Sequence, residues 1–242
     1  MPDFEQAYTA TWQQFSELPH TRDTLVLRHR RFRQWMLGSY ITFIVPINDF
    51  RVIDRLAAWQ HAFESWFQYD PQPPDRLHIT LHHVGRLRRW PGLPLPETLP
   101  RRALSQITDR ARTVLREFEP FTIGIGPLNA FSNVLFAEVH DTDRCLRTLR
   151  AKLRRALPLR ARPVTEWPYL PHITLGHWGT QPAPPLVNAV QPYRQHEPVV
   201  MQVSDVELTL YNFERGPLER DLLEDAEEEI IAEFRLKAPD AG

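Results

Sequence analysis

The chain contains one short segment twice: residues 78–85 read His-Ile-Thr-Leu-His-His-Val-Gly, and residues 172–179 read His-Ile-Thr-Leu-Gly-His-Trp-Gly. Six of the eight positions are identical, and the β-branched residues in both copies favour a strand. Side chains alternate between the two faces of a strand, so the histidine and the threonine two residues later point to the same side. The repeat therefore predicts two equivalent polar half-sites. They consist of His78 and Thr80 in the first copy and of His172 and Thr174 in the second.

The repeat extends beyond these eight residues. An offset of 94 residues, the separation of His78 and His172, also superposes the segments that precede the two copies. Residues 39–47 are rich in β-branched and aromatic side chains and predict a strand, and Asn48 or Asp49 can cap a helix that follows it. A second predicted strand and helix recur in the same order, so we expect a structural duplication. The second strand and helix span about 133–139 and 142–157, and the repeat units span about 39–85 and 133–179.

The remaining segments complete an α+β pattern. Residues 3–18 carry apolar side chains at helical spacing, within an N-terminal extension, residues 1–38, that lies outside the repeat. The proline-rich stretch 182–198 is expected to be a loop. We expect one bilobal domain over residues 39–236, with two antiparallel sheets, helices packed outside them and a central cleft that carries both motifs, followed by a tail at 237–242. The other expected elements are a helix at 102–118 and strands at 121–128, 199–213 and 230–236.

The composition limits the class of protein. The 242-residue chain is 42% hydrophobic and contains no apolar run long enough for a membrane span or a secretory signal, so we expect a cytoplasmic, globular protein. Its formal net charge of -1 argues against a protein that grips long duplex nucleic acid, whereas short anionic ligands are compatible with it. The single cysteine, Cys145, excludes an intramolecular disulfide. We expect a monomer.

Two histidines and two threonines around one cleft suit a displacement at phosphorus. A histidine pKa near about 6.5 allows one imidazole to act as a base while another, protonated, acts as an acid. One imidazole would take a proton from an attacking water or hydroxyl, and the other would protonate the departing ribose oxygen. The threonine hydroxyls would bind non-bridging phosphate oxygens. A single His-x-Thr strand is most often structural, so this hypothesis depends on the second copy.

Metal binding is a competing interpretation, because His82, His83 and His177 add imidazoles close to the two motifs. Strict alternation along the strand places His78 and His82 on one face and His83 on the other. No carboxylate or cysteine completes either motif locally, and the position that matches His82 is Gly176. The sequence therefore favours chemistry without a metal or another cofactor.

The paired motifs resemble those of the two-histidine phosphoesterases, the LigT-like or 2'-5' RNA ligase family. The similarity extends from about residue 39 to 236. The resemblance implies a bilobal α+β fold with the active site between the lobes, and metal-independent chemistry on 2',3'-cyclic phosphates or 2'-5' linked nucleotides. It also implies that the motif histidines are the acid and the base and that the motif threonines bind phosphate. The residues that carry the resemblance are Asp75-Arg76-Leu77-His78-Ile79-Thr80-Leu81 with Gly85, Phe131-Ser132-Asn133, and Leu170-Pro171-His172-Ile173-Thr174-Leu175.

Further residues are predicted to bind substrate. Some relatives carry an arginine three residues after the second threonine, where this chain has His177. Arg162 and Arg76 are alternative sources of a cation for the phosphate, although a surface arginine is the ordinary interpretation of either residue. Tyr169 and Tyr40 offer aromatic faces on which a nucleobase can stack.

The sequence thus predicts a metal-independent phosphodiesterase that opens the 2',3'-cyclic phosphate of an RNA end or a small nucleotide and leaves a 2'-phosphate. Two alternatives remain open. One is hydrolysis or ligation of 2'-5' linked or cyclic signalling nucleotides, which uses the same residues. The other is a non-catalytic module that binds a nucleotide or RNA end, which needs the cleft but not both titrating histidines.

Overall fold

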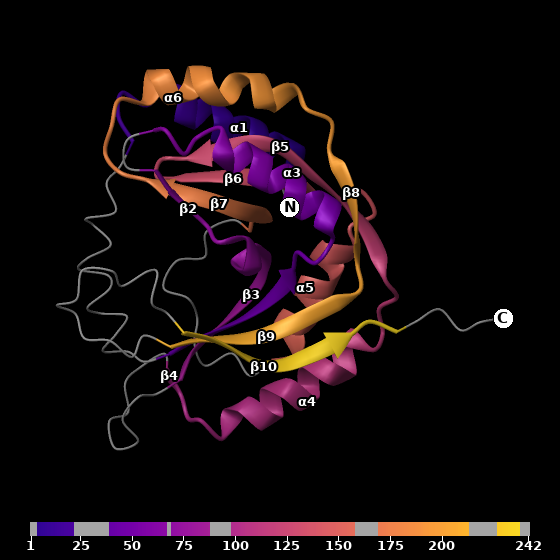
Figure 1. Ribbon diagram of the computed structural model, residues 1–242. Helices are drawn as coiled ribbons and strands as arrows, with labels where there is room; N and C mark the ends of the chain where they lie inside the picture. Colours follow the sequence, from indigo (N-terminus) through magenta and orange to yellow (C-terminus); the bar gives the residue numbers. More distant parts are fainter. Residues whose placement is uncertain are drawn as a thin grey trace.

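The computed structural model describes residues 4–21, 39–66, 69–87, 98–157, 169–212 and 227–237. Within these residues the chain forms ten strands, five α-helices and two short 3-10 helices (Figure 1). The strands are β1 (Tyr40–Pro46), β2 (Tyr69–Pro71), β3 (His78–Leu87), β4 (Thr98–Leu99), β5 (Phe121–Phe131), β6 (Val134–His140), β7 (His172–Trp178), β8 (Val199–Val203), β9 (Asp205–Asn212) and β10 (Glu227–Arg235). The helices are α1 (Phe4–Ser16), α3 (Phe50–His61), η1 (Pro74–Arg76), α4 (Ala103–Leu115), α5 (Cys145–Ala156), α6 (Ala183–Val190) and η2 (Gln191–Gln195).

The strands form one curled sheet with the two motif strands at its centre. Its order is β10-β9-β1-β3-β7-β6-β5-β8, with β2 paired to β7 and β4 paired to β3. The motif strands β3 and β7 are antiparallel neighbours that pair at Ile79 and Ile173. Four strands lie on each side of this junction, so His78 and His172 sit on adjacent strands, each one residue from the paired isoleucine.

The sequence pattern predicts two separate antiparallel sheets, and this prediction is wrong. The two halves share one sheet. The β3–β7 junction joins them because Ile79 and Ile173 present apolar side chains at the two inner edges, and both are fully buried there. The α+β class and the antiparallel pairing of the long strands are confirmed. The structural duplication and the domain boundaries stay predictions.

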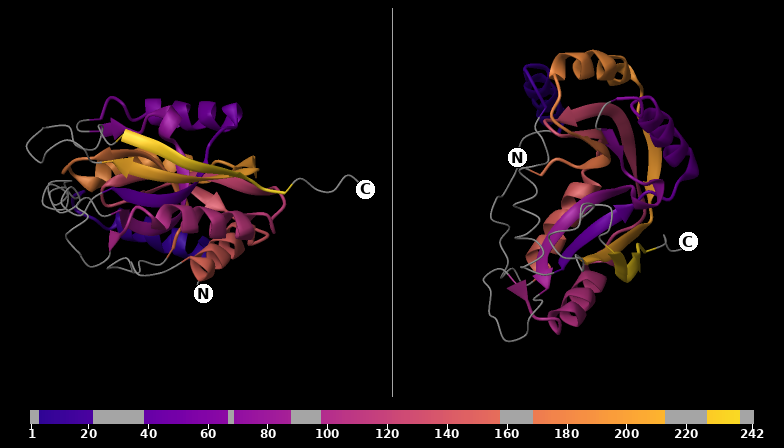
Figure 2. Two further views of the ribbon diagram at one scale, coloured as in Figure 1. Left: turned by 90° about the horizontal axis from the view of Figure 1, so that it is seen from below. Right: turned by 60° about the vertical axis from the view of Figure 1, so that its left-hand side comes forward.

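The two motif helices cross to the opposite half of the sheet. Helix α3 follows β1 in the chain but contacts β7, whereas α5 follows β6 but contacts β3. The side chain of Gln60 on α3 fixes the first contact, since its amide donates to the carbonyls of Leu175 at 2.7 Å and Gln72 at 2.6 Å. Figure 1 shows α1, α3 and α6 at the top around β5–β7, and α4 and α5 below, near β3, β9 and β10. Figure 2 (right) shows α6 and α4 at opposite ends of the molecule.

The proline-rich stretch 182–198 is not a loop, as expected from the sequence, but forms α6 and η2. Pro184 and Pro185 lie in the first turn of α6, where backbone N–H groups have no partner within the helix, so proline is tolerated. Leu186 and Val190, four residues apart, are buried. In the sequence, the prolines that mark the start of α6 therefore hide the helical spacing of its apolar side chains, and the segment is taken for a loop.

A β-bulge interrupts each motif strand at the same place. On β3, Thr80 pairs with Ile44 and His82 with Phe43, which leaves Leu81 as the extra residue. On β7, Thr174 pairs with Phe136 and Gly176 with Leu135, which leaves Leu175, 94 residues after Leu81, as the extra residue. Each bulge shifts the alternation by one residue, so the third residue after each threonine returns to the face of the motif. These residues are His83 and His177.

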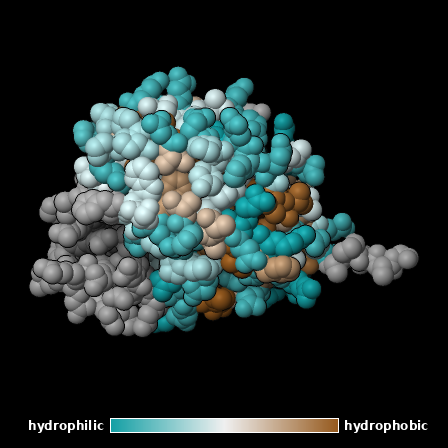
Figure 3. All heavy atoms as spheres, turned by 45° about the horizontal axis from the view of Figure 1, so that its top comes forward, coloured by the Kyte–Doolittle hydropathy of each residue, from teal (hydrophilic) through white to brown (hydrophobic). Residues whose placement is uncertain are grey.

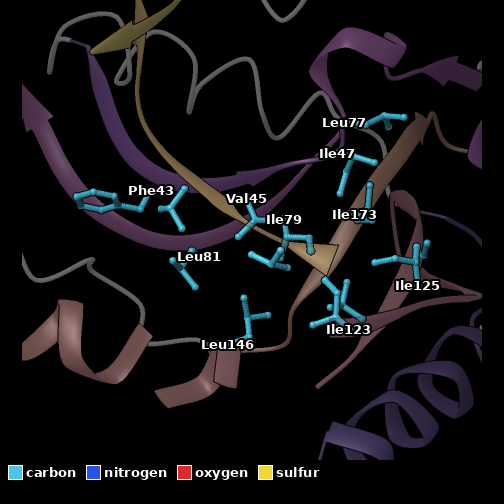
Figure 4. Close-up of a cluster of buried hydrophobic side chains, with 14 of the residues drawn as sticks. Phe43, Val45, Ile47, Leu77, Ile79, Leu81, Ile123, Ile125, Leu146 and Ile173 are labelled. Carbon is cyan, nitrogen blue, oxygen red and sulfur yellow. The ribbon is translucent and has the colours of Figure 1, made fainter. Parts of the chain in front are cut away.

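The strict alternation assumed for His82 and His83 is thus wrong. His82 is 6% exposed and faces the core, whereas His83 is exposed on the face of Thr80. Figure 4 shows the core side of these strands, where Ile79 and Leu81 lie near Leu146 of α5. The inserted bulge residue is the physical cause, because it turns His82 and His83 to the sides opposite to those that strict alternation gives. A second register shift follows at Val84.

The described surface is mainly polar. Hydrophobic side chains form only separate small patches on the face shown in Figure 3. Large hydrophobic residues with high exposure are Phe50, Val200 and Ile230. Among the described residues, no helix combines the length and the hydropathy required to cross a membrane.

Candidate active site

The two motif histidines are held in the same way. Nδ1 of His78 lies 2.8 Å from the carbonyl oxygen of Arg76, and Nδ1 of His172 lies 2.8 Å from the carbonyl oxygen of Leu170. A carbonyl only accepts, so Nδ1 carries the proton and donates in both rings. Nε2 of each neutral imidazole is therefore an unprotonated acceptor. Each motif histidine thus bonds the carbonyl of the residue two positions before it, and the two contacts make the two rings equivalent bases.

Burial dominates the electrostatics of this pair. It lowers the pKa of both His78 and His172, while the backbone hydrogen bonds act in the opposite direction. The charge of His78 lowers the pKa of His172 further, which places the two rings within electrostatic reach of each other. Protonation of one imidazole therefore disfavours protonation of the other, as a pair with one acid and one base requires.

Thr80 and Thr174 stand two residues further along the same strands, and both are half-buried. Neither hydroxyl has a hydrogen-bond partner among the residues that the structure describes. Because each shares a face with its motif histidine, the four polar groups line the same side of the sheet on both sides of the β3–β7 junction. The arrangement offers two bases and two hydroxyl donors to one ligand.

A stacked pair of aromatic rings lies beside His172. Phe131 and Phe136 each lie 5.3 Å from its ring, centroid to centroid, in edge-on geometry, and they stack on each other at 4.3 Å. Phe136 belongs to a second buried cluster, which helix α1 completes with Phe4 and Tyr8. The imidazole lies beside this stacked pair, so the phenyl rings restrict its rotation on that side and make this half of the site apolar.

The neighbourhood of His78 contains a polar pair instead. The ring of Tyr211 on β9 lies 6.4 Å from the His78 ring, and its hydroxyl bonds Oε1 of Glu228 on β10 at 3.1 Å. Burial raises the pKa of Glu228, while the Tyr211 hydrogen bond and the charge of Arg76 lower it. The two half-sites therefore have equivalent backbones but different surroundings. Sequence reasoning missed Tyr211 and Glu228 because they lie more than a hundred residues from His78.

The sequence-predicted binding residues are placed as follows. His177 returns to the motif face after the second bulge, and its backbone pairs with Asp70 of β2. The ring of Tyr40 lies 5.0 Å from His83 and 5.2 Å from the Arg86 guanidinium. His83 itself was missed as a site residue, although the 94-residue offset makes it the counterpart of His177.

The other predicted residues have contacts away from the two motifs or lie outside the described residues. Tyr169 packs edge-on against Phe4 at 6.1 Å and under the Arg150 guanidinium at 4.1 Å, so its ring is engaged on the protein side. Arg76 lies close enough to Glu228 and Tyr211 to lower the pKa of both. Arg162 lies outside the described residues. The described residues hold no group of three or more His, Cys, Asp or Glu side chains placed to bind a metal.

Comparison with known structures supports this architecture. A structure of TT0787 from Thermus thermophilus superposes with a TM-score of 0.57 at 20% identity, covering 82% of this chain and 98% of that one. E. coli LigT in its apo form gives a TM-score of 0.56 at 15% identity, with 82% and 98% coverage. E. coli LigT complexed with 3'-AMP gives 0.56 at 16% identity, with 83% and 99% coverage. At these identities the structures establish the fold alone.

The sequence itself establishes the family. A comparison with curated proteins found no match. The model of the 2'-5' RNA ligase superfamily matches residues 49–216, which include both motif strands and their bulges. Helix α1 precedes the matched region, although it packs against residues around His172. With most of its length matched by one family model and its fold shared with LigT, the chain belongs to the 2'-5' RNA ligase superfamily.

Proposed function

We propose that the protein is a phosphodiesterase that opens 2',3'-cyclic phosphates of RNA ends or nucleotides, with His78 and His172 as acid and base. One observation carries the proposal: both rings donate from Nδ1 to a carbonyl at 2.8 Å, so both present Nε2 to the same side of the sheet. The reported complex of E. coli LigT with 3'-AMP supports a nucleotide ligand, since that protein has the same fold.

In the proposed reaction one imidazole is neutral and the other is protonated. Nε2 of the neutral ring takes a proton from water as the water oxygen bonds to phosphorus. The bond between phosphorus and O3' breaks, and the protonated ring transfers its proton to O3'. The products are a 2'-phosphate and a 3'-hydroxyl, and the pair ends with its proton on the other ring.

The bound phosphate raises the pKa of the imidazole that must act as the acid. Burial lowers the pKa of both free imidazoles, but an anion between them favours the charged form of one ring. Thr80 and Thr174 donate to the non-bridging oxygens, where charge grows during the displacement. We assign His177 to the same phosphate and Tyr40 to the nucleoside.

Ligation is the second candidate, because the matched family is described by that activity. It is the same displacement at phosphorus with a 5'-hydroxyl in place of water as the nucleophile. The bond between phosphorus and O5' forms as one imidazole takes the hydroxyl proton, and the bond between phosphorus and O3' breaks as the other imidazole protonates O3', which leaves a 2'-5' linkage. The test therefore includes an RNA oligonucleotide with a 5'-hydroxyl, and a joined product would demonstrate ligation.

The experiment compares the wild-type protein with His78→Ala, His172→Ala and His61→Ala, in EDTA, on a 2',3'-cyclic mononucleotide and on a cyclic-phosphate-ended RNA. His61 is the matched control, because it lies exposed at the end of α3 and bonds Glu64. We expect product from wild type and His61→Ala only. Full activity in His78→Ala or His172→Ala would overturn the proposal, and tight binding without turnover by wild type would indicate a binding module.

A further inference from the structure

His83 lies on the motif face of β3 and has no part in the reaction proposed above. The bulge at Leu81 turns its side chain to the side of His78 and Thr80, where it is exposed. Both His78 and His172 act on its ionisation, which places it within electrostatic reach of both half-sites. A ligand held between the two motifs therefore lies near this third imidazole.

Hydrogen bonding decides which ring nitrogen His83 offers. Its Nδ1 lies 3.3 Å from Oγ1 of Thr42, the residue opposite it on β1. The Thr42 hydroxyl has one proton and two carbonyls within reach, those of His82 at 3.2 Å and Phe43 at 3.3 Å. We assign that proton to one of these carbonyls, and with this assignment Oγ1 accepts from Nδ1–H of His83. Nε2 is then an acceptor without a proton.

The environment also keeps this ring neutral. The pKa of His83 is lowered to about 4 by desolvation, since protein surrounds the ring although part of the residue is exposed, and by the charges of Arg150, His78 and His172. A neutral ring with an acceptor nitrogen repels phosphate oxygens and accepts from hydroxyl or N–H groups. The ring of Tyr40, itself beside the Arg86 guanidinium, supports His83 from one side.

We propose that His83 recognises the nucleoside part of the substrate by accepting a hydrogen bond from one of its donor groups, a ribose hydroxyl or a base N–H. This inference rests on the proposed function, because it places the scissile phosphate between His78 and His172. His83 and His177 occupy equivalent positions in the two copies of the motif but receive different roles. His177 is assigned to the phosphate and His83 to the nucleoside.

The test pairs a variant with altered substrates. His83→Phe keeps a ring against Tyr40 but removes the acceptor, and His61→Phe is the matched exposed control. The substrates are 2',3'-cyclic AMP, its 5'-deoxy analogue, and the purine analogue without the 6-amino group. We expect His83→Phe to lower kcat/KM for cyclic AMP about three- to tenfold, the loss of one uncharged hydrogen bond, mainly through KM.

The analogue that lacks the recognised donor should show the same loss with wild type and no further loss with His83→Phe. The 5'-deoxy analogue and the base analogue thus distinguish a hydroxyl donor from a base donor. Inhibition by inorganic phosphate should be equal in wild type and His83→Phe.

The outcomes separate the two proposals. If wild type opens no cyclic phosphate, the proposed function fails and this inference fails with it. If wild type is active but His83→Phe matches it on every substrate, only the role of His83 is overturned. A His83→Phe protein that loses phosphate inhibition as well as turnover would instead assign His83 to the phosphate and would also overturn the inference.

Discussion

The hydroxyl of Tyr8 donates to the carbonyl of Pro171, the residue directly before His172. The same hydroxyl accepts from the backbone N–H of Val139 at 3.0 Å, and the amide of Asn129 donates to the Tyr8 carbonyl at 3.0 Å. One side chain of the N-terminal helix thus ties β6 to the start of β7. Tyr8 is a positioning residue, because it acts through the strand that carries His172.

We expect Tyr8→Phe to lower kcat about tenfold with little change in KM, since a small misplacement of a reacting group affects the chemical step most. It should also lower the free energy of unfolding by about 1–3 kcal/mol, because the Val139 N–H and the Pro171 carbonyl lose a buried partner. Steady-state kinetics and urea unfolding measure the two effects. The control is Thr9→Ala, an exposed change on the same helix. Unchanged kcat in Tyr8→Phe would limit this residue to a structural role.

Thr80→Val and Thr174→Val keep the shape of the side chain and remove the hydroxyl. By analogy with lost oxyanion donors, each should lower kcat by about 10²-fold while leaving stability nearly unchanged, because neither hydroxyl bonds another described residue. The inhibition constant for inorganic phosphate should rise in both variants. Equal phosphate inhibition in wild type and variants would argue against these hydroxyls as phosphate ligands.

The pH dependence of kcat/KM should be bell-shaped with its maximum below pH 6.5. Catalysis needs one protonated and one neutral imidazole, and burial lowers the pKa of both His78 and His172 in the free protein. The acid therefore loses its proton below the ordinary histidine pKa of about 6.5 as pH rises. In kcat the alkaline limb should move to higher pH, because the bound phosphate favours the protonated ring. A kcat/KM maximum well above pH 7 would contradict the assignment.

Stability should fall as the solution is acidified from about pH 6.5 towards pH 3. Burial, with the charges of Arg150, His83 and Arg154, lowers the pKa of His82 to about 3, and its Nε2 has no partner in the described structure. Between these pH values the unfolded chain binds a proton that the folded protein excludes, so stability rises with pH and is lost on acidification. The slope of the unfolding free energy against pH measures how many more protons the unfolded chain binds than the folded protein. In His82→Leu this number should be smaller by up to one. An unchanged slope would exclude His82 as a source of acid sensitivity.

Gly176→Ala should destabilise the protein by about 1–3 kcal/mol. A Cβ at this position would lie 2.5–2.6 Å from the ring atoms of Tyr69, whose hydroxyl bonds the carbonyl of Leu175 at 3.1 Å. The double variant Tyr69→Ala, Gly176→Ala should therefore show a smaller cost of the added methyl than the single variant does. Thermal unfolding of the four proteins measures this coupling. Additive effects would indicate that the ring moves aside freely.

The repeated strands and helices could be predicted from the sequence because their signals are local. The helix after β1 begins at the Asp49 cap, whose side chain accepts from the N–H of Arg51, and α5 keeps Leu146, Leu149 and Leu153 on its buried stripe. The motif histidines and threonines followed from repetition alone. Their mutual geometry needed the structure, because it depends on how β3 and β7 meet.

The features that sequence reasoning missed are set by contacts between distant segments. The bulges at Leu81 and Leu175 depend on the register against β1 and β6, and alternation within one strand gives no sign of them. Gly176 stands at the position that matches His82, where β2 pairs with β7 and the ring of Tyr69 leaves no room for a side chain.

The exchange of α3 and α5 between the halves interlocks them. Each half of the sheet is covered by a helix that begins in the other, so neither half can complete its core alone. A hinge that opened the halves would have to separate α3 either from β7, where Gln60 bonds the carbonyl of Leu175, or from β1, the strand that precedes it in the chain. Either movement would expose apolar surface. We therefore expect the two halves to move as one body, and we expect the halves, made as separate fragments, to regain a fold only by recombining with each other.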